Sequence, residues 1–262
     1  TVQASAQVGE NDSECVLEIN LEPGDFALKT ELRKSSDPED KWGANFLYVD
    51  LLEPKKQLPK VLIIGDSISL GYTPILQGMM LDDVEIVRPP NANGGWINCE
   101  GTRRGIEMID EWLALGEFDL IHPNFGLHDL KHVDPKTGRN SNDADDPQQS
   151  SPQQYEKNLG EIVSKLKGTN AKLIFATTTP YPDKPGGPLR RADQPRIYNA
   201  IARRIMHENG ITINDLHEFV LPKMEEWLLP NNVHFRPAGN LELAQQVARV
   251  IEDALGNIPS VR

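Results

Sequence analysis

Short apolar runs alternate along most of the chain with longer segments in which apolar residues recur every three or four positions. The runs at 61–64, 84–87, 119–125, 173–177 and 211–214 have the length and apolar character of β-strands. The run at 61–64 is apolar throughout, which is typical of a central parallel strand buried on both faces. Helical periodicity follows each strand, at about 69–80, 102–115, 151–166, 195–209 and 238–255.

Regular alternation of strands and helices is the pattern of a parallel sheet with helices on both faces. We therefore predict that residues 59–262 form an α/β domain, a three-layer α/β/α sandwich around a five-stranded parallel, flavodoxin-like sheet. Ligands in such folds bind beyond the carboxyl ends of the strands. The residues that directly follow each strand are therefore the candidates for function.

Residues 1–58 have a different pattern. The segments at 15–21, 26–32 and 45–51 alternate apolar and polar residues, as half-buried strands do. Three short strands are too few for an independent sandwich. We predict a β-rich N-terminal extension, which either packs on the main domain or belongs to a larger module.

Composition narrows the classes of partner. The chain has 27 Lys and Arg against 39 Asp and Glu, a formal net charge of −12, so we do not expect a nucleic-acid partner. No apolar run approaches the roughly 18 residues of a membrane helix, and no membrane span is predicted. We expect an exported protein that has lost its leader, with a cytoplasmic location as the alternative, and we predict no oligomeric state.

Metal and cofactor sites are not indicated either. Cys15 and Cys99 are too few for a disulfide framework or a structural zinc site. No set of His, Asp and Glu has metal-ligand spacing, and the glycines near residue 67 do not form a phosphate-binding loop. We therefore predict no cofactor.

A serine and a histidine follow different strands at the same predicted edge of the sheet. Ser67 lies on the tight turn between the first strand and its helix, where the helix N-terminus favours negative charge. His234 lies between the last strand and the last helix, and a histidine within reach of a serine hydroxyl can act as its general base. Separately, Ser67 is equally explained as a turn residue and His234 as a surface residue. Their pairing favours catalysis.

Two more loops end at this edge. Gly101 follows the second strand, and a glycine there allows a backbone N–H to approach a substrate oxygen closely. His128 follows the third strand, and its imidazole N–H is a candidate side-chain donor for an oxyanion hole. A helix-start glycine and a loop histidine are the simpler explanations.

Together these positions resemble the SGNH (GDSL) hydrolase superfamily over about residues 60 to 256. Its blocks I, II, III and V correspond to Gly65-Asp66-Ser67-Ile68-Ser69, Gly101, Gly126-Leu127-His128-Asp129 and Asn231-Asn232-Val233-His234. The order and spacing of the blocks are more specific than any single motif. The resemblance implies Ser67 as nucleophile and His234 as base. It also implies an oxyanion hole made by the Ser67 and Gly101 amides and the side chain of His128.

The sequence departs from the family pattern at two positions. The block III asparagine is His128, which resembles a branch of bacterial GDSL proteins with His at this point. The block V aspartate is Asn231, which can orient an imidazole but cannot offset its positive charge. We favour a Ser–His dyad in which Asn231 holds the ring. The alternative is another carboxylate, Asp129 or Asp215.

Four further residues are candidates for substrate binding: Asp66, Trp96, Arg103 and Asp129. The leading hypothesis is a serine esterase that hydrolyses an acyl ester, in particular an acetyl ester of a carbohydrate. The polar predicted rim lacks the long apolar lid of a lipase, which favours a small or carbohydrate ester as substrate. The alternatives are an acyltransferase, a short-chain lipolytic esterase and a non-catalytic glycan-binding protein on a degenerate SGNH scaffold.

Overall fold

The computed structural model describes residues 58–256. Its strands are β1 (Lys60–Ile64), β2 (Glu85–Val87), β3 (Leu120–Pro123), β4 (Lys172–Ala176) and β5 (Thr212–Asn214). Its long helices are α1 (Ser67–Met79), α2 (Thr102–Leu113), α3 (Pro152–Lys167), α4 (Gln194–Glu208) and α7 (Pro237–Leu255). The predicted elements agree with these bounds to within a few residues. The predicted β-rich extension lies outside the described residues, apart from Leu58.

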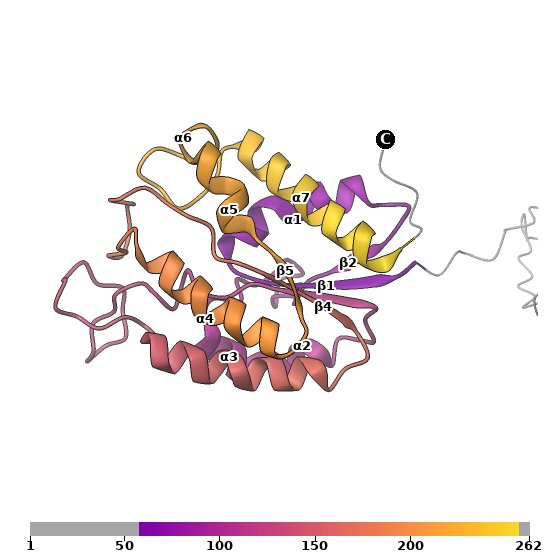
Figure 1. The fold of residues 1–262 in the computed structure, drawn as a ribbon, viewed down its shortest axis with the longest axis horizontal. Coiled ribbons are helices and arrows are strands. Elements are labelled where there is room, and N and C mark those ends of the chain that lie inside the picture. The colour runs from indigo at the N-terminus through magenta and orange to yellow at the C-terminus, as the bar shows by residue number, and fades with distance from the viewer. Residues whose placement is uncertain (1–57, 257–262) are drawn as a thin grey trace, which may run out of the picture. The chain divides into compact units, whose positions relative to one another are not determined.

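The five strands form one parallel sheet in the order β2-β1-β3-β4-β5 (Figure 1). Helices α1 and α7 pack together on one face, while α3 packs against α2 and α4 on the other (Figure 1). The predicted three-layer sandwich with a flavodoxin-like strand order is therefore confirmed. The side chains of Val61–Ile64 have no exposed area, as expected for a strand covered on both faces.

The strand order reverses at β1. The chain runs from β1 to β2 on one side and then returns to β3 on the other side of β1. Ligands bind at such a switch point, outside the carboxyl ends of the strands. The loop after β1, which leads to Ser67, and the loop after β3, which contains His128, both start at this switch point.

Three short helices were missed by the sequence pattern. They are α5 (Leu216–Val220), the 3₁₀-helix η1 (Leu221–Lys223) and α6 (Met224–Trp227), all between β5 and α7. None is long enough to show helical periodicity in an 11-residue or longer window. Buried Leu216, Val220 and Trp227 anchor this connection to the core. None of the helices within 58–256 combines the length and the apolar composition needed to cross a bilayer.

Candidate active site

Ser67 is held at the start of α1 by the residue before it. Asp66 is the N-cap, and its carboxylate Oδ1 accepts a hydrogen bond of 2.9 Å from the backbone N–H of Ile68. The Asp66 side chain is 1% exposed, and its burial raises its pKa to about 6. Asp66 therefore stabilises the turn that carries Ser67. The sequence suggested that Asp66 binds substrate, but its side chain is buried and does not face the surface.

His234 lies directly beside Ser67. Its Nε2 atom is 2.8 Å from Ser67 Oγ, and its Nδ1 atom is 2.8 Å from Asn232 Oδ1. Because an amide oxygen only accepts hydrogen bonds, Nδ1 carries the proton and Nε2 is free to accept the proton of the Ser67 hydroxyl. Buried Val233 and Phe235 fix the backbone on either side of the exposed imidazole. The arrangement is a serine–histidine pair with a neutral residue behind it.

The residue behind the imidazole is Asn232 and not Asn231, which corrects the sequence expectation. Asn231 has φ +50°, and this left-handed turn brings the following side chain, Asn232, under the ring. The carbonyl of Asn231 instead accepts a hydrogen bond of 2.6 Å from the N–H of Gly186. Asn232 Oδ1 also accepts the backbone N–H of His234 at 3.1 Å, so a local Asx turn fixes its side chain.

Substitutions of Asn232 are expected to change the basicity of His234. Asn232→Asp places a carboxylate at Nδ1, offsets the imidazolium charge and is expected to raise kcat for ester hydrolysis about tenfold. Asn232→Ala removes the oriented acceptor and is expected to lower kcat about 10- to 100-fold. Steady-state kinetics with p-nitrophenyl acetate measures both effects. The matched control is Asn231→Gly, because glycine retains the left-handed turn. A larger loss in this control than in Asn232→Ala would contradict the assignment.

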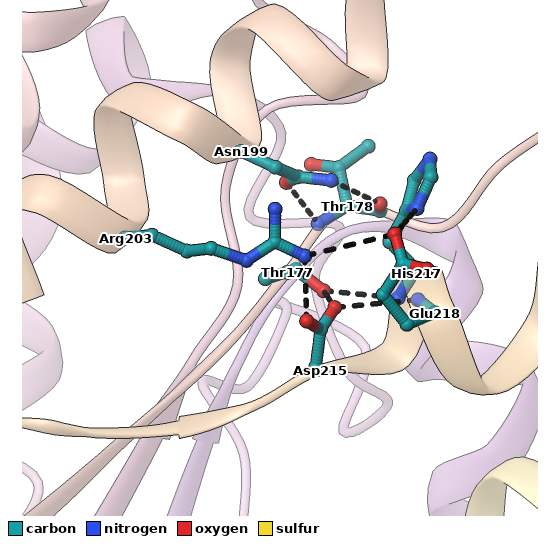
Figure 2. A network of polar contacts seen from close by, with 7 residues as sticks. All are labelled: Thr177, Thr178, Asn199, Arg203, Asp215, His217 and Glu218. Atoms are coloured by element: carbon teal, nitrogen blue, oxygen red, sulfur yellow. Dashed lines mark hydrogen bonds and ion pairs between the residues drawn. The ribbon is translucent and has the colours of Figure 1, made fainter.

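The other proposed carboxylates do not reach the imidazole. Figure 2 shows Asp215 in a network at the ends of β4 and β5, where it is paired with Arg203 and accepts a 2.9 Å hydrogen bond from Thr177 Oγ1. Asp129 is bonded to Thr102. Within the described part of the chain, the side chain of His234 has only Ser67 and Asn232 as hydrogen-bond partners. The dyad interpretation therefore fits the geometry.

Asp129 supports the loop of Gly101 from within the protein. It has no exposed area, and its two carboxylate oxygens accept the backbone N–H of Thr102, the first residue of α2, at 2.9 and 3.1 Å. Burial raises its pKa to about 6, although the bonds from Thr102 oppose that rise. Asn158 donates to Thr102 Oγ1 at 3.2 Å. Asp129 therefore positions Gly101 and does not contact substrate, contrary to the sequence suggestion.

Gly101 has no room for a side chain. A Cβ atom there would lie 2.8 Å from Asp129 Oδ2, and Asp129 is held in place by the start of α2. Nearby, the N–H of Cys99 donates to the carbonyl of Gly65 at 3.1 Å, which keeps this loop against the end of β1. The loop is therefore fixed next to the turn that leads to Ser67.

We expect Gly101→Ala to lower kcat about 10- to 1,000-fold, because the added methyl would clash with Asp129 and displace the 101 amide, which the family resemblance assigns to the oxyanion hole. KM is expected to change much less, because the amide acts on the transition state. Kinetics with p-nitrophenyl acetate and a thermal unfolding midpoint separate this effect from loss of fold. Gly78→Ala is the matched control, because a Cβ at Gly78 meets nothing within 4 Å. A folded Gly101→Ala variant with normal kcat would remove Gly101 from the site.

His128 is kept neutral, and its tautomer is set by a lysine. Burial first, and then the charges of Lys131, Arg190 and His234, lower the pKa of His128 to about 3. Lys131 Nζ lies 3.5 Å from His128 Nδ1. Because an ammonium group has only donors, Nδ1 acts as the acceptor and the proton of His128 resides on Nε2. His128 therefore presents one N–H donor, as an oxyanion hole requires.

The structure places the remaining candidates as follows. Arg103 is on the exposed side of α2, where its Nε is 3.8 Å from Glu107, and it is not brought to Ser67. Trp96 is half-buried, and its ring lies over the guanidinium of buried Arg88. Lys131 and Arg190 are not among the substrate-binding candidates named from the sequence. Their adjacent charges only become apparent once the loops after β3 and β4 are placed together. No cluster of three potential metal ligands occurs within residues 58–256.

Comparisons with known proteins bear on the fold. No family model and no curated protein matches the sequence. A lipase/acylhydrolase from Enterococcus faecalis has a TM-score of 0.59 at 17% identity, covering 78% of this chain and 100% of that chain. An acetyl-xylooligosaccharide esterase from Geobacillus, solved as a mutant, has a TM-score of 0.58 at 18% identity, with coverages of 78% and 96%. The chain has the SGNH hydrolase fold.

A GDSL-like lipase from Bacteroides thetaiotaomicron agrees with this assignment. Its TM-score is 0.55 at 16% identity, and the match covers 78% of this chain and 93% of that chain. These three structural neighbours are a lipase/acylhydrolase, an acetyl-xylooligosaccharide esterase and a GDSL-like lipase. At this level of identity the likeness shows the fold. The activity of the chain depends on the side chains at its own site.

Proposed function

We propose that this protein is a serine esterase that hydrolyses an acyl ester through an acyl-enzyme on Ser67. The observation that carries the proposal is the contact of Ser67 Oγ with His234 Nε2 at 2.8 Å, with Nδ1 of the same ring held by Asn232 at 2.8 Å. These two contacts connect a nucleophile (Ser67), a general base (His234) and a group that orients the base (Asn232). The structural neighbours named as esterases and lipases support the same reaction class.

The first half-reaction transfers the acyl group to the enzyme. Ser67 Oγ forms a bond to the carbonyl carbon while its proton passes to His234 Nε2. The carbonyl oxygen becomes an oxyanion, which the N–H groups of Ser67 and Gly101 and the Nε2–H of His128 stabilise. The bond from carbon to the alcohol oxygen then breaks, and the leaving alcohol takes the proton from His234.

The second half-reaction releases the acid. A water molecule gives a proton to His234 Nε2 and adds its oxygen to the acyl carbon. The bond to Ser67 Oγ breaks, Ser67 recovers its proton from His234, and the carboxylic acid leaves. Each N–H donor of the oxyanion hole contributes about 100- to 1,000-fold to this type of rate.

We further propose that the acyl group is acetyl and that the alcohol belongs to a carbohydrate. The structural likeness to the acetyl-xylooligosaccharide esterase from Geobacillus supports this choice. The experiment combines fluorophosphonate labelling, read by intact mass, with acetate release from acetylated xylooligosaccharides and from p-nitrophenyl acetate. We expect one covalent adduct and faster release of acetate than of butyrate from the matching p-nitrophenyl esters.

Other outcomes select the alternatives. Transfer of acetyl to an added sugar, in preference to water, would indicate an acyltransferase, and faster turnover of longer acyl chains a lipolytic esterase. A wild-type protein that neither labels nor turns over any ester, but binds a glycan, would contradict the esterase and favour a binding protein.

The surroundings of His234 predict how kcat/KM falls at low pH. Burial, and after it the charge of Arg190, lowers the pKa of His234 below its ordinary value of 6.5. His234 acts as base only when unprotonated, so a lowered pKa keeps it active to lower pH. We expect the acid limb of kcat/KM for p-nitrophenyl acetate to have its midpoint below the ordinary histidine pKa of 6.5. A midpoint above 6.5 would contradict this electrostatic picture.

A further inference from the structure

Two nearly buried cationic side chains flank His128. Arg190 is 7% exposed and Lys131 is 9% exposed. Arg190 Nε donates a 3.2 Å hydrogen bond to the carbonyl of Leu127, the residue before His128, and Lys131 Nζ lies 3.5 Å from His128 Nδ1. Both charges therefore lie next to a side chain that the proposed reaction uses.

Neither cation has a carboxylate partner. Among residues 58–256, no ion pair includes Arg190 or Lys131, and Nε is the only side-chain atom of Arg190 that forms a hydrogen bond. The Arg190 Nη groups are not fully buried atoms, so they remain open to a ligand. The carboxylates whose charges act on Lys131 are engaged elsewhere, Glu100 with Arg104 at 3.6 Å and Asp129 with Thr102. A buried charge without a counter-ion is costly in free energy.

Asp66 does not form an ion pair with Arg190 either. Its charge acts on Arg190, but the two side chains are not within 4.0 Å of each other in the described part of the chain. The Asp66 carboxylate is instead bonded to the start of α1.

The two cations also repel each other. The charge of Arg190 lowers the pKa of Lys131, after the larger effect of burial. Other arginines within residues 58–256 have a carboxylate partner, as Arg203 has in Asp215 and Arg204 in Glu156 at 2.7 Å, while buried Arg88 is bonded to hydroxyl and carbonyl oxygens. Two like charges that are close, buried and unpaired at an active-site loop indicate binding of an anion more than they indicate stability.

We propose that Arg190 and Lys131 form an anion subsite beside Ser67, and that the ester substrate carries a carboxylate that binds there. This inference rests on the proposed esterase function and specifies its substrate class. The planar guanidinium offers its Nη groups to a carboxylate, while Lys131 adds a second charge next to His128. Because the proposed acyl group is acetyl, the carboxylate belongs to the alcohol part of the ester. A carboxylate in the acyl part would replace the acetyl assignment but keep the anion subsite.

Two matched substrate pairs test the proposal and separate these sources. Mono-p-nitrophenyl succinate against p-nitrophenyl butyrate reports an acyl-side carboxylate. 3-Acetoxybenzoate against 3-acetoxybenzamide reports an alcohol-side carboxylate. We expect the wild type to favour the anionic member of one pair in kcat/KM by about 10- to 100-fold. Equal kcat/KM within both pairs, with turnover intact, would overturn the subsite and leave the esterase assignment standing.

Three variants locate the preference on Arg190. Arg190→Gln is expected to reduce the ratio within the favoured pair to about one, and Arg190→Lys to retain part of it. The matched control is Arg191→Gln, because Arg191 is the exposed neighbour and its Nη2 reaches only the carbonyl of Ala144, at 3.4 Å. If Arg190→Gln slowed both members equally, Arg190 would be a structural link to Leu127 and the proposal would be wrong.

Two further measurements cover the cases in which Arg190→Gln does not fold or the wild type turns over no ester. If Arg190→Gln does not fold, Lys131→Met is expected to lower the same ratio, kcat/KM for the anionic substrate over kcat/KM for its neutral partner. A general loss of activity lowers both values and leaves this ratio unchanged. If the wild type turns over no ester, the esterase proposal fails. Calorimetric binding of 3-acetoxybenzoate and mono-p-nitrophenyl succinate to Ser67→Ala, each against its neutral partner, then tests the anion subsite alone. Equal binding within both pairs would overturn it.

Discussion

Replacement of Ser67 by alanine is expected to lower kcat for p-nitrophenyl acetate by about 10⁴- to 10⁶-fold and to abolish fluorophosphonate labelling. The reason is that the acyl-enzyme forms on Ser67 Oγ, which donates its proton to His234 Nε2 across 2.8 Å. Binding and the oxyanion donors remain in the variant, so a small residual rate above that of water is expected.

The alanine variant should fold normally. Ser67 is the first residue of α1, while the helix cap is supplied by Asp66. The matched control is Ser164→Ala, which removes an exposed hydroxyl from α3 on the other side of the sheet. Full labelling of Ser67→Ala would show that another residue is the nucleophile and would overturn the proposed mechanism.

Replacement of His234 by alanine is expected to lower kcat about 10³- to 10⁶-fold, because Ser67 then has no acceptor for its proton. The residual rate should lose the acid limb of the wild type, since the titrating group is gone. Kinetics over a range of pH with p-nitrophenyl acetate measures both effects. His207→Ala, an exposed histidine on α4, is the control that should leave rate and pH profile unchanged.

The double variant Ser67→Ala/His234→Ala gives a further check. The two residues act as one unit, so the double variant should be no slower than the slower single variant. Losses that multiply would show that His234 assists catalysis independently of Ser67. Normal activity of His234→Ala would instead point to His128 as the base and contradict the assigned tautomers.

Much of the fold was predictable because its signals are local. The apolar run at 61–64 is long enough and apolar enough to fix a central strand, and the periodicity of α3 and α7 fixes two helices. The short helices α5 and α6 were not predictable, since four or five residues are too few to show a period. Tertiary contacts of Val220 and Trp227 hold them.

The candidate site was predictable in its types of residue but not in every contact. Ser67 and His234 are 167 positions apart, yet each follows a strand of one parallel sheet, so topology alone places them on the same edge. The residue behind His234 was predicted as Asn231 and is Asn232. Only the left-handed backbone at Asn231 decides this one-residue shift.

The sequence by itself determined the order of elements, the parallel sheet and the pairing of Ser67 with His234. Hydrophobic periodicity and the position of each loop can be read from the local sequence, without knowing which other segments pack against it. Tertiary structure decided that Asp66 and Asp129 lie buried as supports and that Arg103 faces away. It also decided that Arg190 and Lys131 both lie near His128 and form no ion pair within residues 58–256. Burial and charge pairing depend on distances between loops that are remote in sequence, and these distances exist only in the folded protein.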